Sequence, residues 1–277
     1  TIQSMGKGKV ASTSAKVAVN KRVNSGTDIR ASDSDSMLEE LLEAGAHLGH
    51  RAERWNPKIA PYIFDVREGV HIFDLEKTRD GLIAACDAIR ARIASGKVVL
   101  LVGTKTQAKG VIVDVAKKTG MPYVGERWIG GFLTNFPQIK RSIDKLHKMK
   151  EEREAGEYKK FTKKEQLLID RQIARFEKVL GGMAMVKEVP DSIFIVDLVR
   201  ERTALAEAIK LGLTTFAIVD TNTDPTHIDY PIPANDDSVK AVLYIVEKFG
   251  EAIESGKSQA SSIKSQTSPN DQNVLNI

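Results

Sequence analysis

Apolar runs of strand length, alternating with helical segments, most constrain the fold of this chain. Residues 97–103 are apolar on both faces, as in strands buried within a parallel sheet, and residues 192–197 form a second buried run. The alternation predicts an α/β fold with a mostly parallel sheet and helices on both faces. The expected strands are residues 70–74, 97–103, 121–124, 192–197 and 214–220, and the expected helices are residues 37–46, 75–95, 106–119, 202–211 and 238–254.

A long helical stretch interrupts this alternation between residues 136 and 180. Narrow apolar stripes at steps of three and four residues favour two helices that bury only their shared seam, and Gly156 lies between them. The stretch holds 13 basic and 8 acidic residues, a net charge of +5. It therefore predicts an inserted antiparallel helical hairpin, or coiled coil. The stripes are Phe136, Ile139, Ile143, Leu146 and Met149, followed by Ile169, Ile173, Phe176 and Leu180.

Both ends of the chain differ in composition from the part between them. Residues 1–36 are rich in Ser, Lys, Val and Ala without lasting periodicity, and residues 258–277 are rich in Ser, Gln and Asn. We expect a flexible N-terminal extension and a flexible C-terminal tail, with Ser36 as the N-cap of the first helix. The α/β domain, of Rossmann or flavodoxin-like type, is expected over residues 37–135 and 181–257.

Composition excludes several classes of protein. No apolar run reaches the length of a membrane span, and the single Cys86 excludes a disulfide framework. Cys86 shares a helical face with apolar residues, so we interpret it as a small buried side chain rather than a nucleophile. The net charge of +4 is modest, and residues 37–257 hold 34 basic and 33 acidic groups. A nucleic-acid partner would need locally concentrated cations.

The segment from His47 to Lys58 concentrates such groups. Arginine and lysine neutralise phosphates, asparagine and histidine bond to sugars or base edges, and Trp55 offers a ring for stacking. Gly49 and Pro57 predict a loop with a defined path. Trp55 could instead anchor the loop to the sheet, so we assign RNA contact to the polar side chains. These are His50, Arg51, Arg54, Asn56 and Lys58.

Two further regions carry candidate RNA contacts. In the loop of residues 125–135, Arg127 and Asn135 repeat the chemistry of the first segment, while Trp128, Phe132 and Phe136 are expected to be mainly structural. Gly130 and Gly131 allow close approach of the backbone to a partner. On the first helix of the expected hairpin, Lys140 and Arg141 are the candidates.

Residues 103–110 follow a buried strand and open a helix, where a phosphate loop would lie. They match neither glycine-rich nucleotide motif, so we favour a surface turn whose Lys105 and Lys109 contact an RNA backbone. Binding of a nucleotide there remains an alternative.

Residues 220–237 contain five aspartates that could hold a hard cation, namely Asp220, Asp224, Asp229, Asp236 and Asp237. Turns and caps explain this composition better. The pair His47 and His50 lacks the further ligands of a zinc site. No catalytic triad has sequence support, so we expect no catalytic residue, cofactor or metal. A nucleotide- or metal-dependent α/β enzyme using residues 103–110 or 220–237 is the alternative function.

Four motifs together resemble the bacterial type of small-subunit ribosomal protein two. They are Leu-Leu-Glu-Ala-Gly-Ala-His-Leu-Gly-His-Arg (41–51), Arg-Trp-Asn-Pro-Lys (54–58), Gly-Glu-Arg-Trp-Ile-Gly-Gly-Phe-Leu-Thr-Asn (125–135), and Asp-Thr-Asn-Thr-Asp-Pro (220–225) with Ile-Pro-Ala-Asn-Asp-Asp (232–237). The resemblance spans residues 37–257 and includes a helical hairpin within an α/β domain. It does not cover the two ends of the chain.

The resemblance implies a non-catalytic, structural protein that binds small-subunit rRNA between the head and the body of the subunit. Its implied partners are that rRNA and neighbouring small-subunit proteins, including the large RNA-binding ribosomal protein one, and no membrane. The implied location is the cytoplasmic ribosome, with an organellar ribosome as an alternative.

Overall fold

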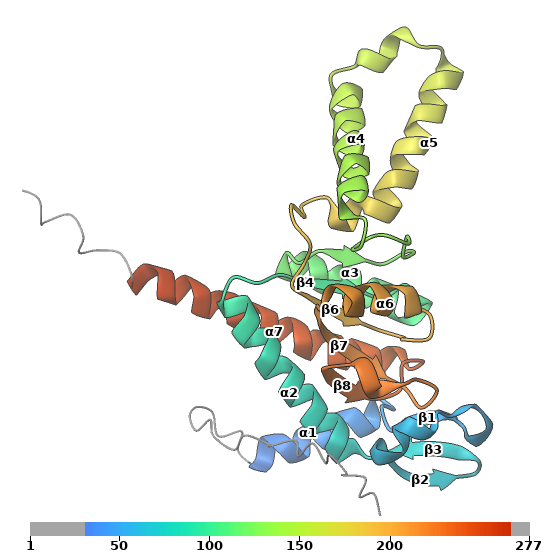
Figure 1. The fold of residues 1–277 in the computed structure, drawn as a ribbon, viewed down its shortest axis with the longest axis vertical. Coiled ribbons are helices and arrows are strands. Elements are labelled where there is room, and N and C mark those ends of the chain that lie inside the picture. Colours follow the sequence, from blue (N-terminus) through green and yellow to red (C-terminus); the bar gives the residue numbers. More distant parts are fainter. Residues whose placement is uncertain (1–30, 267–277) are drawn as a thin grey trace, which may run out of the picture.

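The computed structural model describes residues 31–266, and its principal element is a five-stranded parallel sheet (Figure 1). The strand order is β5-β4-β6-β7-β8, which in chain order reads 2-1-3-4-5, the flavodoxin-like arrangement. The order reverses between β4 and β6. This topology confirms the predicted fold class. The strands are β4 (Val99–Val102), β5 (Tyr123–Val124), β6 (Ser192–Ile195), β7 (Thr214–Val219) and β8 (Tyr230–Pro233).

Alternate residues of the sheet enter two cores, because successive side chains of a strand point to opposite faces. Leu101 and Phe194 face one core, which is completed by the helices α2 (Leu75–Ala94), α3 (Thr106–Thr119) and α7 (Val239–Gln266). Leu100 and Ile195 face the other, with α6 (Arg202–Leu211) and the first half of α4 (Phe136–Glu154). Both faces are therefore covered, as predicted.

The edge strand β8 was not predicted, because its two prolines led us to assign residues 230–233 to the acidic loop of residues 220–237. Pro231 and Pro233 are tolerated there since an edge strand needs ladder hydrogen bonds on one side only. The short helix η5 (Pro225–His227) lies between β7 and β8.

A separate antiparallel sheet contains part of the segment that we expected to be a loop. Its strands, in the order β1-β3-β2, are β1 (Leu48–Arg51), β2 (Ile63–Arg67) and β3 (Val70–Phe73). Only β3 was predicted. Glu68 and Gly69, both with positive φ, form the two-residue turn between β2 and β3, and this turn suits the twist of a hairpin. The short helices η1 (Ala52–Arg54) and η2 (Pro57–Tyr62) connect β1 to β2.

Helices α4 and α5 (Lys163–Leu180) project from one end of the sheet, linked by η3 (Glu157–Lys160) (Figure 1). All five apolar residues of the stripe predicted for α4 are buried. On α5 only Leu180 is buried, and Ile173 and Phe176 are partly buried. A capping box between Thr162 and Glu165 starts α5. The two helices return the chain to η4 (Gly181–Met183). That they form a separate coiled-coil insert stays a prediction.

Two helices extend into regions that we assigned to the flexible ends. Helix α1 (Ala31–Glu43) starts before residue 37, so Ser36 is inside the helix rather than at its N-cap. Helix α7 continues past residue 257, and serine hydroxyls there bond back to carbonyls one turn earlier, as Ser258 does to Glu254. Residues 1–30 and 267–277, where the rest of these predictions fall, lie outside the described residues.

Cys86 lies on α2 against α7, as a half-buried side chain next to the first core. Burial raises the pKa of its thiol to about 12. The thiolate needed for nucleophilic chemistry is therefore disfavoured, which agrees with the structural interpretation of this residue. Among residues 31–266, no helix combines the length and the apolar character needed to cross a membrane.

Candidate nucleic-acid interface

The segment of residues 47–58 lies against the carboxyl end of β7. A Cβ at Gly49 would come within 2.5 Å of Thr221 Cγ2 and 3.1 Å of the His71 carbonyl oxygen, so glycine is required for this close approach. The amide of Asn56 donates to the carbonyl of Thr221 at 2.7 Å. These contacts give the segment the defined path that the sequence predicted, although β1 and two short helices form part of it.

His50 and Asn56 are occupied in holding this segment. His50 Nδ1 lies 3.0 Å from Asp220 Oδ1, and this hydrogen bond raises the pKa of His50. The side chain of Asn56 accepts a hydrogen bond from the amide of Lys58 at 3.0 Å and caps η2. Both side chains, predicted to contact RNA, therefore have a structural partner within the chain.

Trp55 packs against the neighbouring strand β3. Its ring centroid lies 4.8 Å from that of His71 with a tilt of 32°, and 37% of the residue stays exposed. The tryptophan thus anchors the segment, which agrees with the alternative considered from the sequence.

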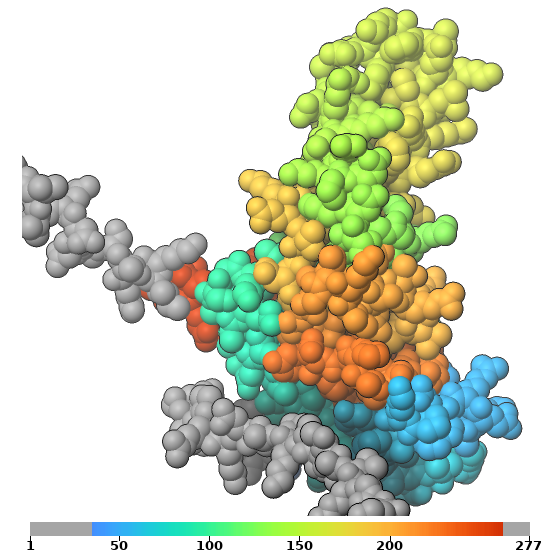
Figure 2. All heavy atoms as spheres, in the orientation of Figure 1, coloured from blue at the N-terminus to red at the C-terminus, as the bar shows by residue number. Residues whose placement is uncertain are grey.

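The cations of the segment differ in their partners. Lys58 Nζ lies 2.6 Å from Asp224 Oδ2, and this contact helps lower the pKa of Asp224 to about 2. Arg51 and Arg54 are exposed, and no hydrogen bond or ion pair to either side chain occurs within the described part of the chain. Figure 2 shows the surrounding segment (blue) bulging from one end of the molecule. The two arginines therefore present uncompensated charge to solvent.

The second candidate loop, residues 125–135, is organised by a single carboxylate on α6. Glu207 accepts hydrogen bonds from Trp128 Nε1 at 3.0 Å, from Gly131 N at 2.7 Å, and from the amides of Leu133 and Thr134 at 3.0 Å each. Burial opposes ionisation of Glu207, but these donors outweigh it and lower the pKa. The loop is thus held rigidly over the sheet.

Aromatic side chains of this loop are structural, as expected, and its polar candidates point outward. Trp128 is buried with its ring 5.1 Å from that of Phe132. Arg127 is exposed without a side-chain hydrogen bond or ion pair to any residue from 31 to 266. Asn135 is also exposed and does not cap α4 with its side chain.

Lys105, predicted to contact an RNA backbone from a surface turn, is largely buried. Its Nζ lies 2.7 Å from Asp236 Oδ1, 2.6 Å from Asp237 Oδ1 and 3.6 Å from Asp197 Oδ2, and only 13% of the side chain is exposed. Burial works against the ammonium ion, but the carboxylates outweigh it and raise the pKa of Lys105. Its charge is neutralised within the fold. Lys109 is more exposed and is paired with Glu126.

The acidic residues of the 220–237 region are engaged in the same way. Asp220 pairs with His50, and Asp229 accepts from the amide of Thr215 at 2.9 Å. Burial raises the pKa of Asp236 to about 7, with a further contribution from Asp220. Within residues 31–266, no cluster of three or more His, Cys, Asp or Glu side chains is arranged to hold a metal ion. These contacts support the structural interpretation of the acidic loop.

Lys140 and Arg141 lie on the exposed face of α4. Lys140 Nζ donates to the carbonyl of Lys187 at 3.3 Å, and Arg141 Nη1 donates to Gln138 Oε1 at 3.4 Å. Neither faces a carboxylate at ion-pair distance among the described residues. Both keep their charge available, although they lie on an element separate from the two loops.

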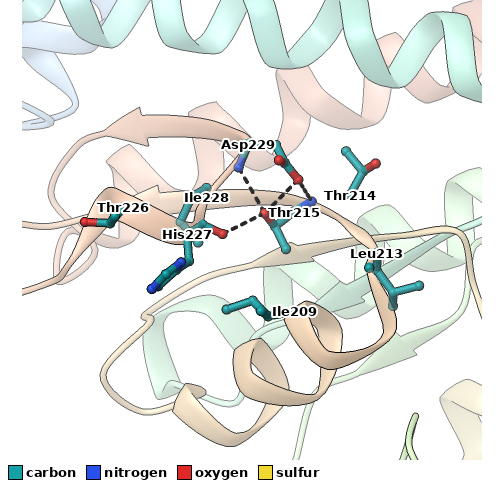
Figure 3. A pocket seen from close by; sticks show the side chains of 9 residues that line it. Ile209, Leu213, Thr214, Thr215, Thr226, His227, Ile228 and Asp229 are labelled. Carbon is teal, nitrogen blue, oxygen red and sulfur yellow. Dashed lines mark hydrogen bonds between the residues drawn. The ribbon is translucent and has the colours of Figure 1, made fainter. Parts of the chain in front are cut away.

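A shallow hollow of about 430 Å³ lies at the amino ends of β7 and β8, at the other end of these strands from the candidate site (Figure 3). Asp229 and Thr215 bond to each other across it, and Thr215 Oγ1 also bonds to the carbonyl of His227. These polar groups satisfy one another, and none of the predicted site residues lines the hollow.

Glu207 is the important residue that sequence reasoning missed. It lies in an otherwise ordinary amphipathic helix, and nothing in its local pattern distinguishes it from a solvated surface glutamate. Its role depends on donors 73 to 79 residues away in the chain.

Comparison with known proteins agrees with these motifs. Residues 41–256 match a family described as Ribosomal protein S2. Proteins named small ribosomal subunit protein uS2 from Petrotoga mobilis, Cytophaga hutchinsonii and Nitratiruptor are 48%, 45% and 47% identical to the chain. These alignments cover 79%, 80% and 79% of this chain and 76%, 87% and 82% of the respective relatives. The chain therefore belongs to the Ribosomal protein S2 family.

Proposed function

We propose that this chain is a structural protein of the small ribosomal subunit that binds rRNA through cations on a rigid α/β platform. Its relatives carry the name of a small-subunit protein. The observation that carries the RNA contact is the exposure of Arg51, Arg54 and Arg127 without intramolecular ion pairs in the described structure. Arginines of this kind neutralise phosphates without selecting a base sequence.

The enzyme alternative has no support from the site. In the 103–110 turn, Lys105 is neutralised by Asp236 and Asp237, and Lys109 is paired with Glu126, rather than open to a nucleotide phosphate. A location between head and body and a contact with ribosomal protein one rest on the family resemblance alone. We infer Lys140 and Arg141 as secondary contacts, because their charges face solvent on α4.

Assembly into subunits tests the proposal. The full chain should co-sediment with small subunits, and the variant in which Arg51, Arg54 and Arg127 are alanine should do so more weakly as salt rises. A control with the same change in charge replaces Lys117, Lys118 and Lys210, which lie at the far ends of α3 and α6. Equal incorporation of both variants at every salt concentration would refute the assigned contacts, whereas absence of the unmodified chain from subunits would refute the function.

A further inference from the structure

Two arginines outside the proposed contacts lie where the loop after β6 leads into α6, and Arg202 is the first residue of that helix. Arg200 and Arg202 are both exposed, and Val199 beside them is 54% exposed. Arg202 has no side-chain hydrogen bond or ion pair with any other described residue. An exposed apolar side chain beside two cations is a combination that suits the sugar-phosphate backbone of a nucleic acid.

The backbone of this loop is held in an uncommon conformation. Asp197 has a φ of +65°, in the left-handed region that residues other than glycine seldom adopt. Its Oδ1 accepts the amide of Arg200 at 3.0 Å, and its Oδ2 lies 3.6 Å from Lys105 Nζ. Strained positions of this kind persist where the surroundings hold them, often at functional sites.

The guanidinium of Arg200 is oriented by a short chain of hydrogen bonds. Its Nε donates to Thr104 Oγ1 at 2.8 Å, and the Thr104 hydroxyl donates to Glu201, which is 2% exposed. Nη1 and Nη2 have no hydrogen-bond partner in the part of the chain that the structure describes. The parallel N–H groups of Nη1 and Nη2 match two oxygens of a phosphate.

Arg200 and Arg127 follow strands that end at the same end of the sheet. Val102 of β4 is in register with Val124 of β5 and with Ile195 of β6, so the carboxyl ends of these strands lie side by side. This is where the strand order reverses, which is the place for ligands in open α/β sheets.

The carboxylates around this edge are already engaged. Asp197 faces Lys105, Glu201 accepts from Thr104, and Glu126 pairs with Lys109. Asp236 and Asp237, which follow β8, also surround Lys105. The outward guanidinium of Arg200 therefore keeps its charge for an external anion.

We propose that Arg200 binds one rRNA phosphate through Nη1 and Nη2, while Arg202 contacts a neighbouring phosphate and Val199 packs against the intervening sugar. This contact rests on the proposed function, since it assigns an additional part of the same RNA interface. It extends that interface from the 125–135 loop across β4 to β6.

Directed cleavage of rRNA tests the position. Iron tethered to Val199→Cys, in a Cys86→Ser background, should cut rRNA within assembled small subunits. Iron at Lys210→Cys, at the far end of α6, should not. If the tagged protein sediments with subunits but position 199 cuts no rRNA, or crosslinks only to a neighbouring protein, the inference fails while the function stands. If the unmodified chain does not enter subunits, both fail.

Variants of Arg200 test the chemistry. Binding of Arg200→Ala to small subunits depleted of this protein should lose about one unit of the log–log salt slope. Arg200→Lys should keep the slope but bind roughly fivefold more weakly, because an ammonium ion cannot make two parallel bonds. Lys210→Ala should change neither quantity. An unchanged slope for Arg200→Ala would overturn the phosphate contact.

Discussion

Two candidate basic regions, residues 47–58 and 103–110, have similar sequence chemistry but different electrostatic roles. In the first, Arg51 and Arg54 are exposed and have no carboxylate partner within residues 31–266. In the second, Lys105 lies among Asp197, Asp236 and Asp237. A cation in a loop is therefore available to RNA only if the fold places no carboxylate beside it. Removal of Lys105 should therefore lower the stability of the fold, whereas removal of Arg51 and Arg54 should weaken RNA binding and leave stability almost unchanged.

The largest expected effect is on stability, in Lys105→Ala. Loss of the ammonium leaves the buried carboxylate of Asp236, and Asp197 beside it, without the cation that they share, and breaking a buried ion pair costs about 3–5 kcal/mol. Urea unfolding measures this cost. Lys109→Ala, at a more exposed pair with Glu126, is the control and should cost about 1 kcal/mol or less. Similar losses for the two variants would contradict the distinction between the regions.

Glu207→Gln is expected to have the next largest effect. The amide that replaces one carboxylate oxygen would face donors from the 125–135 loop, and an unsatisfied buried group costs about 1–3 kcal/mol. The free energy of unfolding should fall by that amount, and incorporation into subunits should weaken because Arg127 loses its rigid support. Glu154→Gln, at an exposed glutamate, is the control. Retention of full stability would show that Glu207 does not organise the loop.

The pH dependence of stability tests the contact of His50, in the 47–58 segment, with Asp220, which follows β7. The folded-state pKa of His50 is raised, chiefly by its hydrogen bond to Asp220, so its contribution is complete below the unfolded-state pKa near 6.5. That contribution is lost as pH rises through the folded-state value. The elevated pKa of Asp236, mainly due to burial, acts in the same direction.

Burial lowers the pKa of His47 and of His71, which acts in the opposite direction, so the test isolates His50. The difference in unfolding free energy between the unmodified chain and His50→Gln should decline by about 1 kcal/mol from pH 6 to 8. Unfolding of both proteins at several pH values measures this difference. A difference between the two proteins that stays constant or grows over this range would be inconsistent with the raised pKa of His50.

The smallest expected effect on stability belongs to Arg51→Ala combined with Arg54→Ala. Because neither side chain has a partner among the described residues, the free energy of unfolding should change by no more than about 0.5 kcal/mol. Thermal and urea unfolding check this, and Lys105→Ala serves as the contrasting variant. A loss above about 2 kcal/mol would mean that the two arginines support the fold rather than the interface.

Much of the fold was predictable because its signals are local. Buried runs gave the strands β4, β6 and β7, and glycines at positive φ end α3 at Gly120 and α6 at Gly212, as expected. Strands β1, β2 and β8 were missed, since they are short, and those of the small sheet are largely exposed. The start of α1 and the end of α7 were missed because these serine-rich stretches lack the sustained apolar periodicity by which the other helices were recognised.

The sequence by itself determined the layered α/β architecture, the positions of most helices and the set of cations that could meet RNA. These properties depend on periodicity and on neighbours a few residues apart. Only the tertiary structure decided which cations remain free. Lys105 meets Asp236 across 131 residues of chain, and His50 meets Asp220 across 170. The first pair forms because parallel strands bring distant loops to one end of the sheet, and the second because β1 of the small sheet packs against the carboxyl end of β7. Coulomb interactions depend on distances in space, which local sequence does not encode.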